Sequence, residues 1–212
     1  NPKKPGRPSH ALHTYWVANL RLVLDLIVSP AKSHRAGKAL PGLTEILDQL
    51  QPQQRPALVR GDCGFGNEPF IAELEERNQT YLFKLRQTAG VKKLLSRQFA
   101  RDDWSTPGPA DQGWSAVEDT LKLSGWEKAR RVIVLRRAVK SDLVLSRKAQ
   151  PSSDELPRLS EWGEQIELLM PDKDVQAWEY AVLVTNSAYP LAAFGQLYRD
   201  RADCENGFDE LK

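Results

Sequence analysis

Hydrophobic and polar residues alternate near the start of the chain with the period of a β-strand. Between Leu20 and Val28, apolar residues occupy every second position: Leu20, Leu22, Leu24, Leu26 and Val28. Successive side chains of a strand point to opposite faces, so these residues share one face. The preceding run, His10 to Ala18, also reads as a strand. We expect the two runs to pair as antiparallel neighbours, with the apolar face in a core.

A helical period replaces this alternation at two later places. Four leucines predict a helix from Pro41 to Leu50, with the proline near its first turn, after a loop from Ser29 to Gly37. These leucines are Leu40, Leu43, Leu47 and Leu50. A second amphipathic helix, Glu68 to Arg77, lies between short strands predicted at Pro56 to Asp62 and Thr80 to Arg86. Strand, helix and strand with short connections predict an α/β sheet.

The pattern changes from about Gln87 to Gln176, which we interpret as a β-rich insertion. A basic helix, Val91 to Ala100, precedes Pro/Gly/Ser-rich turns and three β-type runs. These runs are Ala116–Leu123, Arg131–Val139 and Gln165–Met170. A strand from Trp178 to Asn186 then returns to the core, and a helix from Leu191 to Lys212 ends the chain. Residues 1–86 and 177–212 are therefore expected to form the first and last parts of one core, and residues 87–176 the insertion.

Composition narrows the class of protein. Of the 212 residues, 41% are hydrophobic and 27% are charged, which is typical of a globular protein rather than a disordered or fibrous one. No apolar run approaches the roughly 20 residues of a membrane-spanning helix. Cys63 and Cys204 lie far apart without metal-ligand spacing, which argues against a zinc site or a disulfide scaffold. We expect a cytoplasmic protein with no membrane partner.

Basic residues are unevenly distributed, although the net charge is only +2. They gather in the first ten residues, between Lys84 and Arg101, and between Lys128 and Lys140. So small a net charge would not draw nucleic acid by itself, but local clusters can contact phosphates. A solvated face is the alternative for each cluster, and the sequence leaves both open.

The last predicted helix carries an unusual stripe. At about 100° per residue, one acid, two bases and a phenol point the same way. They are Glu205, Arg201, Lys212 and Tyr198. Such a mixed stripe indicates a face directed at a charged ligand. A solvated face with an Arg201–Glu205 pair, worth about 0.3 to 0.5 kcal/mol, fits the spacing equally well.

Asp62 is the second candidate functional residue. It ends a predicted strand, and ligand sites of open α/β sheets gather beyond the carboxyl ends of strands. Gly61, Gly64 and Gly66 would let backbone or substrate approach closely. A turn or helix-capping aspartate is the alternative reading of Asp62.

Together these features resemble the DDE transposases of bacterial insertion sequences. The spacing Tyr198-x2-Arg201-x3-Glu205-x6-Lys212 is similar to the Tyr-Arg-Glu-Lys signature of the insertion-sequence-four type. The stretch "RGDCGFGNEPFIAELEERN" resembles the family's segment around the second catalytic aspartate, and "NPKKPGRPSH" resembles the segment after the first. The resemblance covers nearly the whole chain, although the middle contributes little.

The resemblance implies a ribonuclease-H-like mixed sheet flanked by helices, whose three carboxylates hold two divalent metals, Mg²⁺ or Mn²⁺. Asp62 and Glu205 would be two of these carboxylates. The implied phosphate and DNA contacts are Tyr198, Arg201, Lys212, Lys3, Lys4 and Arg7. The implied function is metal-dependent cleavage and strand transfer at transposon ends. The implied partners are transposon-end and target DNA, bound by a homodimer on paired ends in the bacterial cytoplasm, at the nucleoid.

The family's first aspartate lies on a strand before the segment that "NPKKPGRPSH" resembles. The given sequence starts at Asn1, so we expect the first core strand and the first carboxylate to be missing from these 212 residues. Asp25 is no substitute, because it lies within an alternating strand and matches no motif. We therefore expect the chain to be catalytically inactive on its own.

The same residues suggest three other functions. A DNA-binding remnant without catalysis is compatible with the basic clusters and the missing strand. A tyrosine recombinase would use Tyr198 as its nucleophile, but Glu205 would then have no role. A generic nucleotide-binding domain lacks support, because the chain has neither a GxGxxG motif nor a P-loop.

Overall fold

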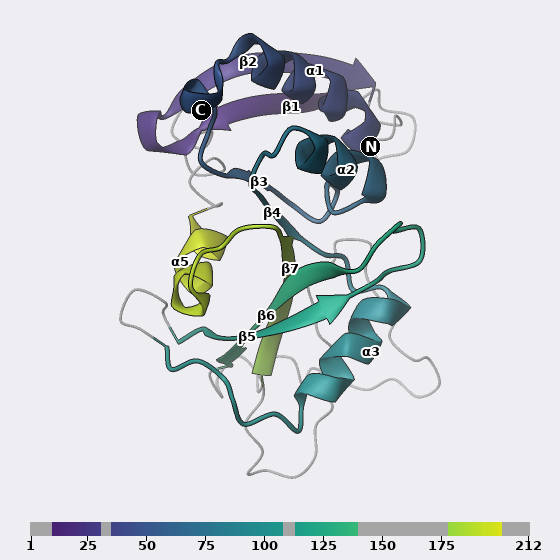
Figure 1. Ribbon diagram of the computed structural model, residues 1–212, viewed down its shortest axis with the longest axis vertical. Coiled ribbons are helices and arrows are strands. Elements are labelled where there is room, and N and C mark those ends of the chain that lie inside the picture. The colour runs from purple at the N-terminus through teal and green to yellow at the C-terminus, as the bar shows by residue number, and fades with distance from the viewer. Residues whose placement is uncertain (1–9, 31–34, 108–112, 140–177, 201–212) are drawn as a thin grey trace, which may run out of the picture.

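The computed structural model describes residues 10–30, 35–107, 113–139 and 178–200. These residues form a mixed α/β structure with two sheets (Figure 1). The strands are β1 (His10–Val17), β2 (Leu22–Pro30), β3 (Val59–Gly61), β4 (Tyr81–Lys84), β5 (Ser115–Leu121), β6 (Arg130–Ala138) and β7 (Trp178–Thr185). The helices are α1 (Arg35–Gln49), α2 (Glu68–Glu76), α3 (Ala89–Gln98) and α5 (Phe194–Arg199), with short 3-10 turns at Ala18–Leu20, Pro52–Gln54 and Leu191–Ala193. No helix in these ranges is long and apolar enough to cross a membrane.

The larger sheet has the strand order β3-β4-β7-β6-β5. Strands β3 and β4 are parallel, with Arg60 opposite Leu82, and the other neighbours are antiparallel. Strands β5 and β6 belong to the region interpreted as an insertion, yet they join this sheet through β7. The run Gln165–Met170 lies outside the described residues, and the division of the chain at residues 87 and 177 stays a prediction.

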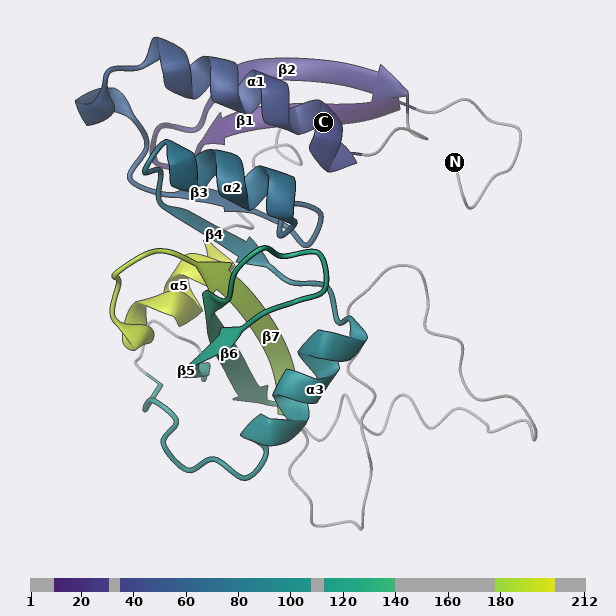
Figure 2. The same ribbon diagram turned by 45° about the vertical axis from the view of Figure 1, so that its right-hand side comes forward.

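Alternation along the central strands produces two separate apolar layers. On β6, Val132 and Val134 face the layer that also contains residues of α1, α2 and α3. Ile133 and Leu135 face the opposite layer, which contains Phe194 of α5. Helices α3 and α5 therefore cover opposite faces of the five-stranded sheet (Figure 2). This arrangement follows from the period of two, because both faces of a central strand are apolar.

The predicted antiparallel hairpin is confirmed, but its apolar face is not in a core. Strands β1 and β2 pair from His10–Pro30 to Val17–Leu22. The face with Tyr15 and Ile27 packs under α1 at Gly42. The opposite face is exposed; it contains Leu12, Leu22, Leu24, Leu26 and Val28. Periodicity tells which residues share a face, whereas the position of α1 decides which face is covered.

The first helix starts earlier than its sequence signals suggest. It begins at Arg35, so the loop predicted from Ser29 to Gly37 is too long and Pro41 lies inside the helix. An internal proline removes one backbone hydrogen bond and is normally costly. Leu43 and Leu47 of the same helix are buried in the core, and burial of apolar side chains stabilises the helix. The burial of these two leucines confirms the predicted helical face.

Candidate functional site

Asp62 follows the last residue of β3 and starts a tight turn. Its Oδ1 accepts a hydrogen bond from the Gly64 amide at 2.8 Å, and its carbonyl accepts one from the Phe65 amide at 3.2 Å. The side chain is otherwise exposed. The structure therefore confirms that Asp62 is a turn residue, through one of its carboxylate oxygens. The other oxygen faces solvent or a ligand.

The residues after Asp62 fix this turn to helix α2. The Asn67 side chain donates to the Gly64 carbonyl at 3.0 Å and accepts from the Phe70 amide, so it caps the helix. A Cβ on Gly61 would lie 2.8 Å from a ring carbon of Phe65. Gly61 thus permits close approach of the protein's own aromatic core, as expected of a glycine at this position.

Helix α5 packs beside the carboxyl end of β3. The Arg60 guanidinium donates to the Leu197 carbonyl at 3.1 Å, a contact between residues 137 positions apart in the sequence. Arg60 lies on β3, two residues before Asp62. This hydrogen bond holds the strand that leads to Asp62 against the helix that carries Tyr198.

Tyr198 lies on the face of α5 that meets the sheet. Its ring packs edge-on against Trp114 with the centroids 5.5 Å apart. The Lys84 ammonium lies 5.6 Å from the centre of the same ring. Trp114 is itself buried in the protein. Tyr198 is therefore held between a fixed aromatic wall and a cation.

A small hollow forms where these groups meet. It is lined by Arg60, Gly61, Leu82, Lys84, Leu183, Leu197 and Tyr198. Because β3 and β4 are parallel, their carboxyl ends meet at one edge, and Lys84 ends β4 as Asp62 follows β3. The rule that drew attention to Asp62 could therefore have found Lys84 as well. Arg60 had no such signal, since its partner is a distant backbone carbonyl.

Carboxylate oxygen is the ligand that hard divalent cations prefer, and Asp62 offers one such group at the site. An exposed carboxylate at a strand end can reach a metal without burying an unpaired charge. Within the described ranges, no three His, Cys, Asp or Glu side chains come together as a complete metal site. Asp25 is exposed on β2, which belongs to the other sheet, and its side chain accepts a hydrogen bond from the Leu26 amide.

Several predicted site residues fall outside the described part of the chain. They are Lys3, Lys4, Arg7, Arg201, Glu205 and Lys212. Their roles stay predictions. Of the four-residue signature, Tyr198 is described, and the structure brings it to the hollow beside β3.

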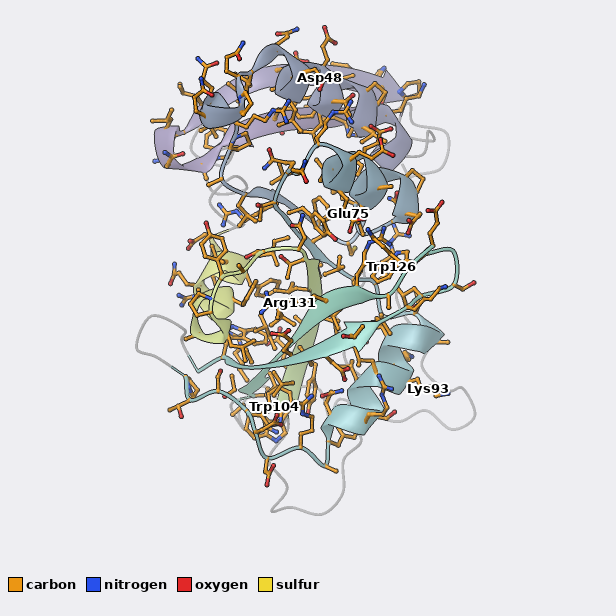
Figure 3. The ribbon with its side chains drawn as sticks, in the orientation of Figure 1. Asp48, Glu75, Lys93, Trp104, Trp126 and Arg131 are labelled. Atoms are coloured by element: carbon orange, nitrogen blue, oxygen red, sulfur yellow. The ribbon has the colours of Figure 1, made fainter. Side chains whose placement is uncertain are left out.

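An ionic network behind the site joins α2 to the first residue of β6. The guanidinium of Arg130 bonds Glu68 at 2.5 and 2.9 Å and Glu75 at 2.9 and 3.0 Å. Only 3% of the Arg130 side chain is exposed. Figure 3 shows Glu75 on α2 and Trp126, whose ring the Arg130 guanidinium covers, near the start of β6.

The network changes the acidity of Glu75. Burial by itself would raise its pKa, but hydrogen bonds from Arg130, Lys128 and Tyr81 outweigh burial and lower the pKa to about 2. Burial and then the bond to Glu75 raise the pKa of the Tyr81 phenol. Glu75 therefore stays ionised throughout the neutral range and anchors the helix that follows the Asp62 turn.

Comparison with known proteins identifies the family of the chain. A search of curated proteins finds no significant match. A family model described as "Transposase DDE domain" matches residues 2–212, which is nearly the whole chain. The protein therefore belongs to the DDE transposase family.

Proposed function

We propose that the carboxyl end of β3 and helix α5 form the cleavage and strand-transfer centre of an insertion-sequence-four type transposase with a ribonuclease-H-like core. The DDE family catalyses DNA transposition, binds DNA and generally uses divalent metal. The observation that carries the proposal is the hydrogen bond from Arg60 to Leu197, 3.1 Å long. It joins the strand leading to Asp62 to the helix of Tyr198, so that two motifs distant in sequence become neighbours.

In this proposal, Asp62 and Glu205 supply two of the three carboxylates. Two bound Mg²⁺ or Mn²⁺ ions would supply an activated nucleophile and neutralise charge on the leaving oxygen. The Gly64 amide donates a hydrogen bond to Asp62 Oδ1, which fixes the orientation of the Asp62 carboxylate. Arg201 with its planar fork and Lys212 as a point charge would grip phosphates of the transposon end.

Tyr198 and Lys84 would orient the reacting strand. A phenol and an ammonium are both hydrogen-bond donors, and a phosphate offers several acceptor oxygens. The edge-on contact with Trp114 restricts the Tyr198 ring, so its hydroxyl is already positioned before DNA arrives. Arg60, by contrast, is committed to the Leu197 carbonyl and positions α5.

The third carboxylate would come from a strand beside β3. In the described residues, β3 pairs with β4 on one side, and the β1–β2 hairpin is a separate sheet. A strand carrying an aspartate could join β3 at its other edge, next to Asp62. We propose that these 212 residues alone do not cleave DNA, since the described residues place no third carboxylate beside Asp62.

Metal binding and cleavage test the two parts of the proposal separately. Mn²⁺ binding can be titrated by electron paramagnetic resonance. The Mn²⁺ affinity of Asp62→Asn should be lower than that of the wild type by roughly 10-fold or more, because losing even a residue that only hydrogen-bonds a metal ligand lowers metal affinity about 10-fold. Asp25→Asn is the matched control and should bind as wild type. Equal Mn²⁺ affinity in Asp62→Asn and wild type would overturn the ligand assignment.

Plasmid nicking tests the expected inactivity. The wild-type chain should leave supercoiled DNA intact in Mg²⁺ or Mn²⁺, whereas nicking that disappears in Asp62→Asn would show an active centre.

The alternative of a DNA-binding remnant rests on the basic clusters. It predicts salt-dependent DNA binding with no Mn²⁺ binding that depends on Asp62. A covalent DNA adduct on Tyr198 would instead indicate a tyrosine recombinase.

The remaining proposals concern assembly and location. In the intact enzyme, a homodimer would hold paired transposon ends, with Lys3, Lys4 and Arg7 as additional phosphate contacts. The place of action would be the bacterial cytoplasm, at the nucleoid. Cross-linking of the chain in the presence and absence of DNA tests the dimer.

A further inference from the structure

The stretch between Arg77 and Arg101 has a one-sided charge. Its 25 residues contain seven Lys or Arg residues and no Asp or Glu. They include Lys84 at the candidate site and the whole of α3. Solvated protein surfaces usually carry positive and negative residues side by side. A segment with only positive residues therefore favours an anionic partner.

The cations of α3 lie on its outer face. At about 100° per residue, Lys92, Lys93 and Arg97 fall within an arc of roughly 140°. All three are exposed, and 58% of the Arg97 side chain is accessible. Figure 3 marks Lys93 on this outer side of α3. The helix thus presents its charges together and away from the sheet.

The inner face of α3 holds this orientation rigidly. Val91, Leu94 and Leu95 are buried in the core. Gln98 is also buried and donates to Asp119 of β5 at 2.8 Å. A Cβ on Gly90 would lie 2.8 Å from Leu123, so the start of the helix packs closely against the β5–β6 connection. The basic face is therefore a preorganised surface and not a loose tail.

The described acidic residues contribute little to neutralising this face. Among the described residues, the side chains of Lys92 and Lys93 have no ion pair or hydrogen bond. Arg97 has a long contact of 3.8 Å to Asp119, which already accepts the Gln98 bond. Like charges at positions i and i+4, such as Lys93 and Arg97, repel each other and destabilise a helix slightly. A bound polyanion would remove this repulsion.

A short segment of the chain links the candidate site to the basic face. The chain leaves β4 at Lys84, passes the exposed Arg86 and enters α3 at Ala89 (Figure 1). Ten helical residues span about 15 Å, which matches about four phosphates of one DNA strand. Helix α5 covers the opposite face of the sheet, so the sheet separates DNA on α3 from the segment held by Tyr198.

We propose that the outer face of α3 is a second DNA-binding surface, which contacts the backbone of duplex DNA without reading its sequence. The DNA held there is the part of the duplex that runs away from the reacting phosphate. The inference rests on the proposed function in one respect, that the polyanion is DNA. It needs neither the metal site nor cleavage.

Salt-dependent binding tests this surface. The 212-residue chain is titrated with a fluorescein-labelled duplex of random sequence, and anisotropy gives the affinity at several salt concentrations. In Lys92→Gln/Lys93→Gln, the slope of log affinity against log salt should fall by about 1.8 in magnitude, about 0.9 for each lost phosphate contact. Arg21→Gln/Lys38→Gln removes two exposed charges elsewhere and should keep the wild-type slope. All three proteins should have the same melting temperature by circular dichroism.

The outcomes separate the surface from the catalytic proposal. A wild-type slope in Lys92→Gln/Lys93→Gln overturns the α3 surface but leaves DNA binding at the Asp62 site intact. An equal fall in both double variants overturns it too, since net charge would then explain the effect. A wild-type chain with no salt-dependent DNA binding overturns this inference and counts against the proposed function as well.

Discussion

Replacing Arg130 with methionine would leave two glutamates without their shared partner. The change removes four hydrogen bonds of 2.5 to 3.0 Å to Glu68 and Glu75. Only 14% and 18% of these two glutamate side chains are exposed, so water cannot fully replace the guanidinium. Breaking a buried ion pair by removing one partner costs about 3 to 5 kcal/mol. Lys128 and Tyr81 still contact Glu75, which places the expected loss near the lower end.

Urea unfolding measures this loss. The unfolding free energy of a protein falls by about 1 to 3 kcal/mol per molar urea, and a chain of this length should lie near the upper value. The urea midpoint of Arg130→Met should therefore be about 1 to 2 M below that of the wild type. The control is Arg97→Met, which breaks an exposed 3.8 Å pair and should cost less than about 1 kcal/mol. If Arg97→Met lowers the unfolding free energy as much as Arg130→Met does, the burial of Arg130 has no special effect.

A compensating variant tests the cause of the loss. Replacing Glu68 and Glu75 with leucine in the Arg130→Met background removes the stranded carboxylates, and buried ion networks replaced by apolar residues often lose little stability. Much of the lost stability should therefore return. If the triple variant is as unstable as Arg130→Met, stranded charge is not the cause and the reasoning is refuted.

Two further predictions follow from the geometry. Because the pKa of Glu75 is lowered from 4.5 to about 2 in the folded protein, its contribution is complete above pH 4.5 and is lost as pH falls towards 2. The unfolding free energy of the wild type, measured over this pH range, should fall by about 3 kcal/mol from this group, and that of Glu75→Gln should fall less. Identical pH profiles would contradict the pairing of Glu75 with Arg130. Leu24 on the hairpin is 54% exposed, so Leu24→Lys should change the unfolding free energy by less than about 0.5 kcal/mol and raise solubility. A loss of 2 kcal/mol or more, as expected for a core leucine, would show that this face is covered.

Local patterns in the sequence predicted much of the secondary structure. The spacing of Phe70, Ile71 and Leu74 placed α2 within one residue of its observed end, because an amphipathic period and an Asn cap both act locally. The alternation from Leu20 to Val28 predicted β2 and its shared face. The start of α1 was missed, because Pro41 is a common first-turn signal and tolerance of an internal proline depends on tertiary packing.

The candidate site shows the same division. Asp62 and Tyr198 were recognised from short motifs, since residue types and gaps are properties of the sequence itself. Lys84 was missed, although its place at the end of a strand parallel to β3 was a usable signal. The contact of Arg60 required knowledge of which elements become neighbours. The basic cluster of α3 was visible in the sequence, whereas the burial of the opposite helix face was seen only in the fold.

By itself, the sequence determined the elements, the family motifs and the faces on which side chains lie, because these depend on neighbours a few residues away. The tertiary structure decided which faces are covered and which distant residues meet. The leucine face of β2 is exposed because α1 packs on its other side, and Arg130 meets glutamates 55 and 62 positions away. Arg60 reaches Leu197 across 137 positions. Such contacts depend on how the whole chain closes, which no local period records.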